Sequence, residues 1–312
     1  SGSQLVISRQ SDASLLLTPI ELVKTTKLGE ASITVTKGEE PNTIIRKIIA
    51  LYLVGYNFIR INTKDERITS PHRNFIKDLT RRKLVGTEII TDSPNEMKLQ
   101  ILLSYPELSV ESALRRIHLI ASSMHDDAIK ALEGLNKELA KDVIPLDDEV
   151  DRFNFYTIRQ LKAAVQSESV LRDIGLSNPK DCLGYRLIAK SVERIADHAV
   201  KIAENILSLN HSIDNYTVKK ISEMSSFARS VFDDSMKSLY GKDYLLADNA
   251  VTRSKTIAVM ENDLMKIVVK RVEAADMSNI RMIMESTRRT AEYAGDIAEI
   301  VLNLNINQVI TV

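Results

Sequence analysis

Apolar and polar residues alternate through the first third of the chain, and this pattern predicts short strands separated by two helices. Strands are expected at 31–36, 56–63, 87–92 and 96–104, helices at 41–55 and 70–83, and a β-hairpin over 4–17. Pro41 and the Ser70–Pro71 pair mark helix starts, and Gly55 marks a helix end. The order β-α-β-α-β-β indicates a small α/β sandwich that ends near Pro106.

Beyond Pro106 the strand pattern gives way to the three-to-four spacing of amphipathic helices. Leu114, Ile117, Ile120 and Met124 show this spacing in the first of them. Six long helices are predicted, at 108–135, 145–165, 180–209, 213–240, 245–273 and 277–305.

The sequence of the last three predicted helices resembles that of the preceding three, which indicates a tandem repeat. "DDAIKAL" (126–132) aligns with "DDSMKSL" (233–239), and "SVERIADHAVKIAE" (191–204) aligns with "STRRTAEYAGDIAE" (286–299), where seven of fourteen residues are identical. The expected fold class is therefore α+β and mainly α, with a small α/β module before two tandem three-helix bundles. The expected domains are a tag and remnant hairpin at 1–17, the α/β module at 18–107, and helical repeats at 108–211 and 212–312.

Composition restricts the function without identifying it. The 312-residue chain has 42 Lys plus Arg and 42 Asp plus Glu, so no global charge favours nucleic acid or an anionic membrane. A single cysteine, Cys182, excludes an intramolecular disulfide and is consistent with a reducing cytoplasm, where we expect the protein to reside. No apolar run reaches the length of a membrane span, so a membrane-inserted protein is not expected.

The most unusual chemical feature is a set of carboxylates at helical spacing. Glu193, Asp197 and Glu204 lie on one strip of a helix, and Asp147 and Asp151 repeat the acid-x-x-x-acid spacing on another helix. One interpretation is a solvated face opposite the apolar one, with Asp147 at the positive end of a helix dipole. The other is a cation site, because carboxylates suit hard ions such as Mg²⁺, Mn²⁺ or Fe³⁺.

The two acidic pairs can meet only if the helix that carries Glu193 and Asp197 extends past its neighbour. With a helix start near Pro145, the required overhang is about 10 Å at 1.5 Å per residue. The sequence permits this overhang but does not require it.

Catalytic signatures are missing from the sequence. No histidine follows an acid by three residues, as a di-iron carboxylate bundle would need. His125 and His198 are expected to be packing or surface residues, and the sequence has no phosphate-binding glycine loop or nucleophile elbow. We therefore expect a protein that is not an enzyme, with a metal-carboxylate enzyme as one alternative.

The combination of "DDEVDRF" (147–153), "SVERIADHAVKIAENI" (191–206) and the weaker second copy resembles the PhoU phosphate-uptake regulators. This resemblance covers essentially the whole chain, and "YLVGYNFIRI" and "LSVESALRRIHLIASSMHDDA" are similar to archaeal members. It implies two three-helix bundles, a role in phosphate transport and its signalling, and a site for iron, manganese, magnesium or zinc.

Within the resemblance, the family's metal motifs correspond to Asp147 and Asp151 on one helix and to Glu193 and Asp197 on the other. The second copy departs from this pattern, as these positions read Glu261, Met265, Arg288 and Glu292. An arginine at a ligand position removes a donor, so Glu261, Glu292 and the nearby Asp296 form only a weaker candidate set. We expect one acidic site at most.

The resemblance also implies partners. A phosphate transporter or a two-component sensor protein is the expected contact, and a homodimer is the expected assembly. Archaeal relatives carry an AbrB-like DNA-binding module, and "QLVISRQSDASLLL" (4–17) is similar to its last strands with the rest removed. The alternative function is therefore a DNA-binding transcriptional regulator, in which the missing module would contact DNA and the helices would sense a signal or dimerise.

Overall fold

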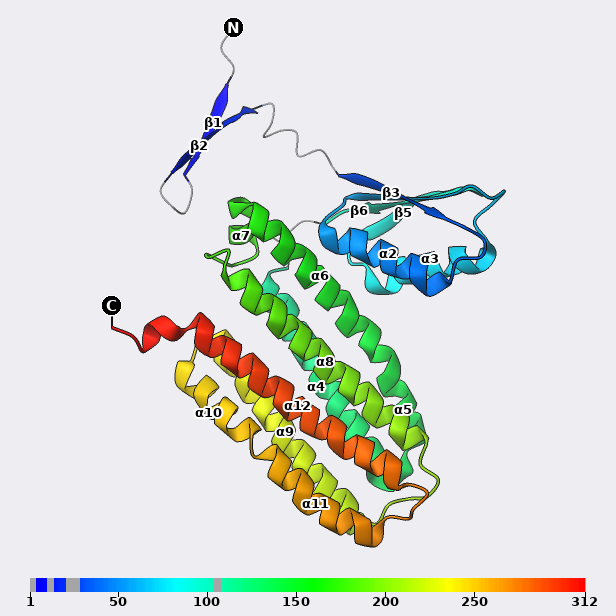
Figure 1. Ribbon diagram of the computed structural model, residues 1–312, viewed down its shortest axis with the longest axis vertical. Coiled ribbons are helices and arrows are strands. Elements are labelled where there is room, and N and C mark those ends of the chain that lie inside the picture. The colour runs from blue at the N-terminus through cyan, green and yellow to red at the C-terminus, as the bar shows by residue number, and fades with distance from the viewer. Residues whose placement is uncertain (1–3, 10–13, 21–28, 104–107, 312) are drawn as a thin grey trace. The chain divides into compact units, whose positions relative to one another are not determined.

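A computed structural model describes residues 4–9, 14–20, 29–103 and 108–311 of the chain. It divides into two compact units, residues 1–81 with 86–103, and residues 82–85 with 104–312. The predicted boundary at Pro106 and the tag residues 1–3 lie outside the described residues. Near the N-terminus, β1 (Leu5–Arg9) and β2 (Leu15–Pro19) pair antiparallel, which confirms the predicted hairpin (Figure 1).

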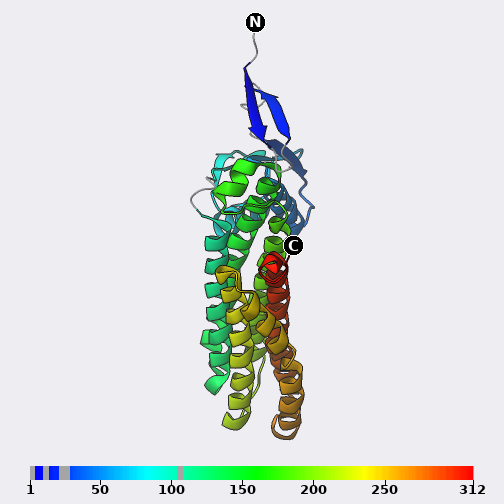
Figure 2. The same cartoon turned by 90° about the vertical axis from the view of Figure 1, so that its left-hand side faces the viewer.

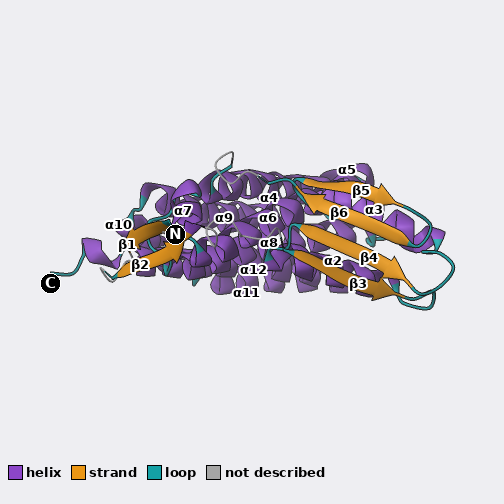
Figure 3. Cartoon of the chain, turned by 90° about the horizontal axis from the view of Figure 1, so that it is seen from above, coloured by secondary structure: helices purple, strands orange, loops and turns teal. Residues whose placement is uncertain are grey.

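The first unit contains the predicted α/β module. Its elements are β3 (Glu30–Val35), α2 (Pro41–Val54), β4 (Phe58–Thr63), α3 (Ser70–Lys83, whose last two residues belong to the second unit), β5 (Thr87–Asp92) and β6 (Glu96–Ile101). The sheet order is β3-β4-β6-β5, with β3 and β4 parallel and the other neighbours antiparallel. Seen from above, the sheet lies on one side of the two helices (Figure 3). Ile59 and Ile61 of β4 are fully buried, as is Ile48 of α2.

The second unit is a bundle of long helices (Figures 1 and 2). Its α-helices are α4 (Val110–Leu132), α5 (Lys137–Val143), α6 (Asp147–Gln166), α7 (Glu168–Asp173), α8 (Asp181–Leu207), α9 (Asn215–Gly241), α10 (Tyr244–Ser254), α11 (Ile257–Arg271) and α12 (Met277–Leu304). Each repeat has three long helical segments, called arms below. In the first repeat they are α4, α5 with α6, and α8, and in the second they are α9, α10 with α11, and α12. The α+β, mainly helical fold class is thus confirmed.

The predicted helix 145–165 is confirmed as α6, which spans Asp147–Gln166. A short helix that was not predicted, α5, precedes it from Lys137, and Asn136 caps this helix by accepting a hydrogen bond from the Leu139 N–H at 3.1 Å. Pro145 lies inside a single 3₁₀ turn, 144–146, that joins α5 to α6. The arm therefore continues upstream of the predicted start.

The predicted helix 245–273 is in fact two helices, α10 and α11. At the break, Ser254 Oγ donates to the Val251 carbonyl and Thr256 Oγ1 donates to the Arg253 carbonyl, each at 2.8 Å. Hydroxyl groups that bond to nearby carbonyls compete with the helical pattern and bend it. No glycine or proline marks this break, so the apolar periodicity concealed it.

The two repeats contact each other through reciprocal residue pairs. His118 of α4 packs edge-on against Phe232 of α9, with ring centroids 4.8 Å apart, while His125 Nε2 lies 2.7 Å from Ser225 Oγ. Residues 118 and 225 are related by the repeat offset of 107, and so are 125 and 232. Such exchange of partners is the property of an isologous interface, so the repeats pack about a pseudo-two-fold axis.

The same relation holds between α8 and α12. His198 and Tyr293, which are related by the second offset of 95, contact each other with their rings tilted and the centroids 5.8 Å apart. Fully buried residues of both repeats, from Val110 to Val301, belong to one continuous apolar core. None of the described helices is long and apolar enough to cross a membrane.

Candidate metal centre

The position of helix α5 shows that the two acidic pairs lie at similar heights along the bundle. Asp147 is ten residues beyond Lys137, the start of its arm, and Asp197 is ten residues before Leu207, the end of α8. Both are thus about 15 Å from the same end of an antiparallel pair, while Asp151 and Glu193 are each about 21 Å from it. The last part of α8 thus extends past the start of α6 and lies beside α5, which is the overhang that the sequence permitted but did not require.

The pKa shifts of Asp147 and Asp197 include contributions from the other carboxylates of this set. Burial, together with the nearby charges of Asp151 and Asp197, raises the pKa of Asp147 to about 7. Burial likewise raises the pKa of Asp197 to about 6, with an added contribution from Glu193. Both shifts mean that negative charge is unfavourable here, so the site would gain from a bound cation.

Two of the four carboxylates are held by lysines. Lys190 Nζ lies 2.5 Å from both carboxylate oxygens of Glu193, three residues further along α8. Lys83, in the segment 82–85 that belongs to the helical unit, places Nζ 2.8 Å from Asp151 Oδ2. Lys190 lies three residues before Glu193 on the same helix, so this pair could be predicted from the sequence, whereas nothing local indicates Lys83.

Of the other two carboxylates, Asp147 has an oxygen without a partner in the part of the chain that the structure describes. Asp147 Oδ1 is buried and has no hydrogen-bond partner among the described residues. As the side chains are placed, however, no three His, Cys, Asp or Glu groups of the described residues converge on one point. The residues fit a hard cation in charge and donor type, and binding would require Asp151 and Glu193 to exchange their lysines for the ion.

The histidines do not add ligands to this set. His125 is fully buried between α4 and α9, and burial lowers its pKa to about 4. His198 contacts Tyr293, and burial followed by the nearby Lys201 charge lowers its pKa to about 4. Both rings are therefore neutral packing groups near neutral pH, as their pattern in the sequence suggested.

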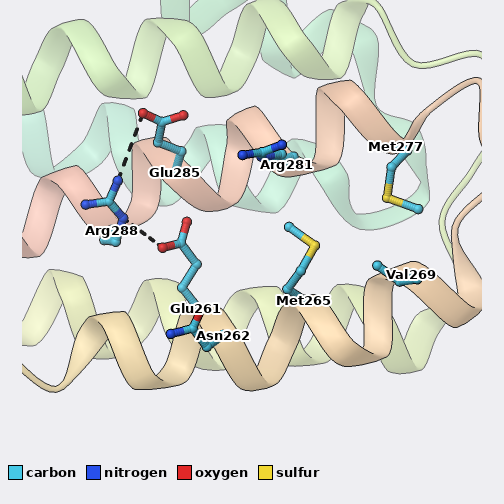
Figure 4. Close-up of a pocket in the computed structure, with 8 residues that line it drawn as sticks. All are labelled: Glu261, Asn262, Met265, Val269, Met277, Arg281, Glu285 and Arg288. Atoms are coloured by element: carbon cyan, nitrogen blue, oxygen red, sulfur yellow. Dashed lines mark ion pairs between the residues drawn. The ribbon is translucent and has the colours of Figure 1, made fainter.

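At the corresponding position of the second repeat, an arginine side chain supplies the positive charge. Arg288 Nε lies 2.7 Å from Glu261 Oε2, and the same guanidinium also pairs with Glu292 (Figure 4 shows the Glu261 pair). Arg289 adds a second contact to Glu292 at 3.0 Å. Asp296 lies one turn further along α12 outside this ion-pair cluster, and burial and Glu299 raise its pKa. Glu261 and Glu292 are thus neutralised by the chain itself.

The comparisons with known proteins point to one family. Residues 114–206, which run from α4 to α8 and include all four acids, match the model described as the PhoU domain. Residues 114–206 thus resemble a PhoU domain. The chain is similar to the Thermotoga maritima protein named phosphate-specific transport system accessory protein PhoU homolog 1, at 26% identity over 60% of this chain and 80% of the relative. The Borreliella burgdorferi PhoU homolog is 25% identical over 59% and 85%, respectively.

Solved PhoU structures share the helical fold. PhoU from Pseudomonas aeruginosa aligns with a TM-score of 0.56 at 18% identity, over 64% of this chain and 96% of that one. The phosphate transport system regulatory protein PhoU from Streptococcus pneumoniae aligns with a TM-score of 0.54 at 17% identity, over 65% and 96%. At these identities the likeness concerns the fold alone.

Proposed function

We propose that this chain is a non-enzymatic regulator of phosphate uptake and phosphate signalling that acts by contact with a transporter or sensor protein. The observation that carries the proposal is the PhoU-domain match over residues 114–206. It is supported by relatives whose names describe accessory proteins of phosphate-specific transport systems. Cytoplasmic placement, a homodimer and the DNA-binding alternative stay predictions.

A transport assay tests the regulatory role. Cells from which this gene has been removed would be compared with parent cells for uptake of radiolabelled phosphate, in phosphate-rich and phosphate-poor media. We expect the deleted cells to lose most of the difference between the two media, and reintroduction of the gene to restore it. Uptake that is identical in parent and deleted cells under both conditions would refute the proposal.

Within this role, we propose that Asp147, Asp151, Glu193 and Asp197 form a metal site on the first repeat. The support is the shared level of the four acids, the raised pKa values of Asp147 and Asp197, and the unpartnered Asp147 oxygen. A bound ion would supply positive charge that neutralises the cluster and orders this surface of α6 and α8. Oxygen-only donors favour iron, manganese or magnesium over zinc.

Elemental analysis of purified protein tests the metal site directly. We expect the native chain to retain a metal ion that the double variant Glu193→Ala, Asp197→Ala loses. The matched control is Glu261→Ala, Glu292→Ala in the second repeat, where Arg288 already supplies the positive charge. Equal metal content in the native chain and the first variant, or no metal in either, would exclude the site.

A further inference from the structure

A groove of about 550 Å³ lies between α11 and α12 of the second repeat (Figure 4). One end is charged, because Glu261 and Glu285 lie on either side of the Arg288 guanidinium, at 2.7 and 4.0 Å. The groove occupies the position that the acidic site has in the first repeat. Since the acids at this end are already paired, they leave little demand for an added cation.

The other end of the groove is apolar. Met265 reaches from α11 toward α12, and Met277 reaches from α12 toward α11 (Figure 4). Val269 stands beside them with 63% of its surface exposed. Methionine side chains are flexible and polarizable, so surfaces that contain them adapt to varied apolar partners. This end can accept an apolar side chain with little rearrangement.

Arg281 stands between the two ends, on α12 (Figure 4). Its side chain is exposed, and it makes no ion pair or side-chain hydrogen bond with any residue that the structure describes. Arg288, by contrast, is neutralised by Glu261 and Glu292. An unpaired guanidinium beside an apolar surface favours an occupant that carries a carboxylate next to an apolar group.

We propose that this groove docks a segment of a partner protein in which an acidic residue stands next to apolar ones. The apolar side chain lies against Met265, Val269 and Met277, and the carboxylate pairs with Arg281. A basic segment is disfavoured because Arg281 would repel it. This inference rests on the proposed contact with a partner protein, but it does not depend on the metal site of the first repeat.

A peptide titration tests the proposal on the full chain. The probes are acetyl-Leu-Glu-Leu-amide and its Gln and Lys counterparts, and the readout is the NMR signals of ¹³C-labelled methionine methyl groups, of which the chain has nine. We expect the Glu peptide to shift the Met265 and Met277 signals and to bind about two- to fivefold more tightly than the Gln peptide. The Lys peptide should bind most weakly.

Variants localise the effect. Arg281→Gln should remove the preference for the Glu peptide, whereas Lys219→Gln, at an exposed lysine of α9, should preserve it. Val269→Ser should weaken the Glu and Gln peptides alike. Equal binding of the Glu and Lys peptides, or no shift of the Met265 and Met277 signals with any peptide, would overturn the proposal. Neither outcome would change the phosphate-uptake or metal experiments.

Discussion

Asp147 and Asp197 resist ionisation in the folded chain, with pKa values raised to about 7 and about 6. An acid whose pKa is higher in the folded state than in the unfolded state binds its proton more tightly when folded. Its stabilising effect is present at low pH and is lost as pH rises through the folded value. The metal-free chain should therefore lose stability between about pH 4 and pH 7 from these groups.

Asp147→Asn should reduce the change of stability with pH, because an amide cannot ionise. The measurement is urea unfolding in the presence of a chelator at several values between about pH 5 and pH 8. Asp248→Asn, at an exposed aspartate of α10, provides a control outside the first repeat. If Asp147→Asn retained the full pH dependence of the native chain, the raised pKa of Asp147 would be contradicted.

Arg288 should matter more for stability than Arg281. Its side chain is only 21% exposed and contacts Glu261 and Glu292, so Arg288→Met would leave two half-buried carboxylates close together. We expect a loss of about 1–2 kcal/mol in the free energy of unfolding, between the values for exposed and buried pairs. Arg281→Met should change it by less than about 0.5 kcal/mol. Equal effects in urea denaturation would contradict the ion-pair assignment.

At the scale of elements, the close approach of α12 to the end of α10 depends on Gly295. A Cβ added there would lie 2.5 Å from Ser254 Oγ and 3.0 Å from Ser254 Cβ. Gly295→Ala should therefore destabilise the chain by about 1–3 kcal/mol, despite the better helix propensity of alanine. Thermal unfolding monitored by circular dichroism measures the effect.

Two further variants make that comparison specific. Ser254→Ala should recover part of the loss in the Gly295→Ala background, since it removes the nearest atom. Gly184→Ala should cost less, because its added Cβ meets only the ends of the Ile300 and Leu304 side chains, at 3.1 and 3.2 Å. A Gly295→Ala variant as stable as the native chain would show that the helices separate without cost.

Periodicity predicted elements well where it was long and uninterrupted. The strands and the long helices α4, α8, α9 and α12 lie where the apolar pattern placed them. The pattern failed at α5, whose seven residues hold too few apolar positions, although Asn136 as its cap was a readable signal. It also failed between α10 and α11, because hydroxyl-to-carbonyl bonds leave no mark on apolar spacing.

The sequence predicted the four carboxylates of the candidate site, but it did not predict the helix and the lysine that lie around them. Spacing alone indicated the acid pairs, but their shared level depends on α5, which the apolar pattern did not predict. The Lys83–Asp151 pair joins residues 68 positions apart, so no local pattern could predict it. By contrast, Arg288 at a ligand position was visible in the sequence, and the structure places it against Glu261 and Glu292.

At the scale of the molecule, the helical unit should unfold as one. Its apolar core runs without a break through both repeats, so neither bundle buries its own surface completely. We expect one urea transition for α4 to α12 by far-ultraviolet circular dichroism, and no cooperative transition for residues 108–211 expressed alone. A fragment that unfolds cooperatively by itself would show that the repeats are independent domains.

The pairing of His118 with Phe232 and of His125 with Ser225 has a consequence for how such a protein can change. In a dimer of identical chains every substitution appears in both halves, so a ligand cannot be lost on one side alone. Joining the halves in one polypeptide removes that restriction. One half can then keep Glu193 while the other carries Arg288 at the matching position. A single molecule can therefore have an acidic surface on one repeat and a neutralised surface at the same place on the other.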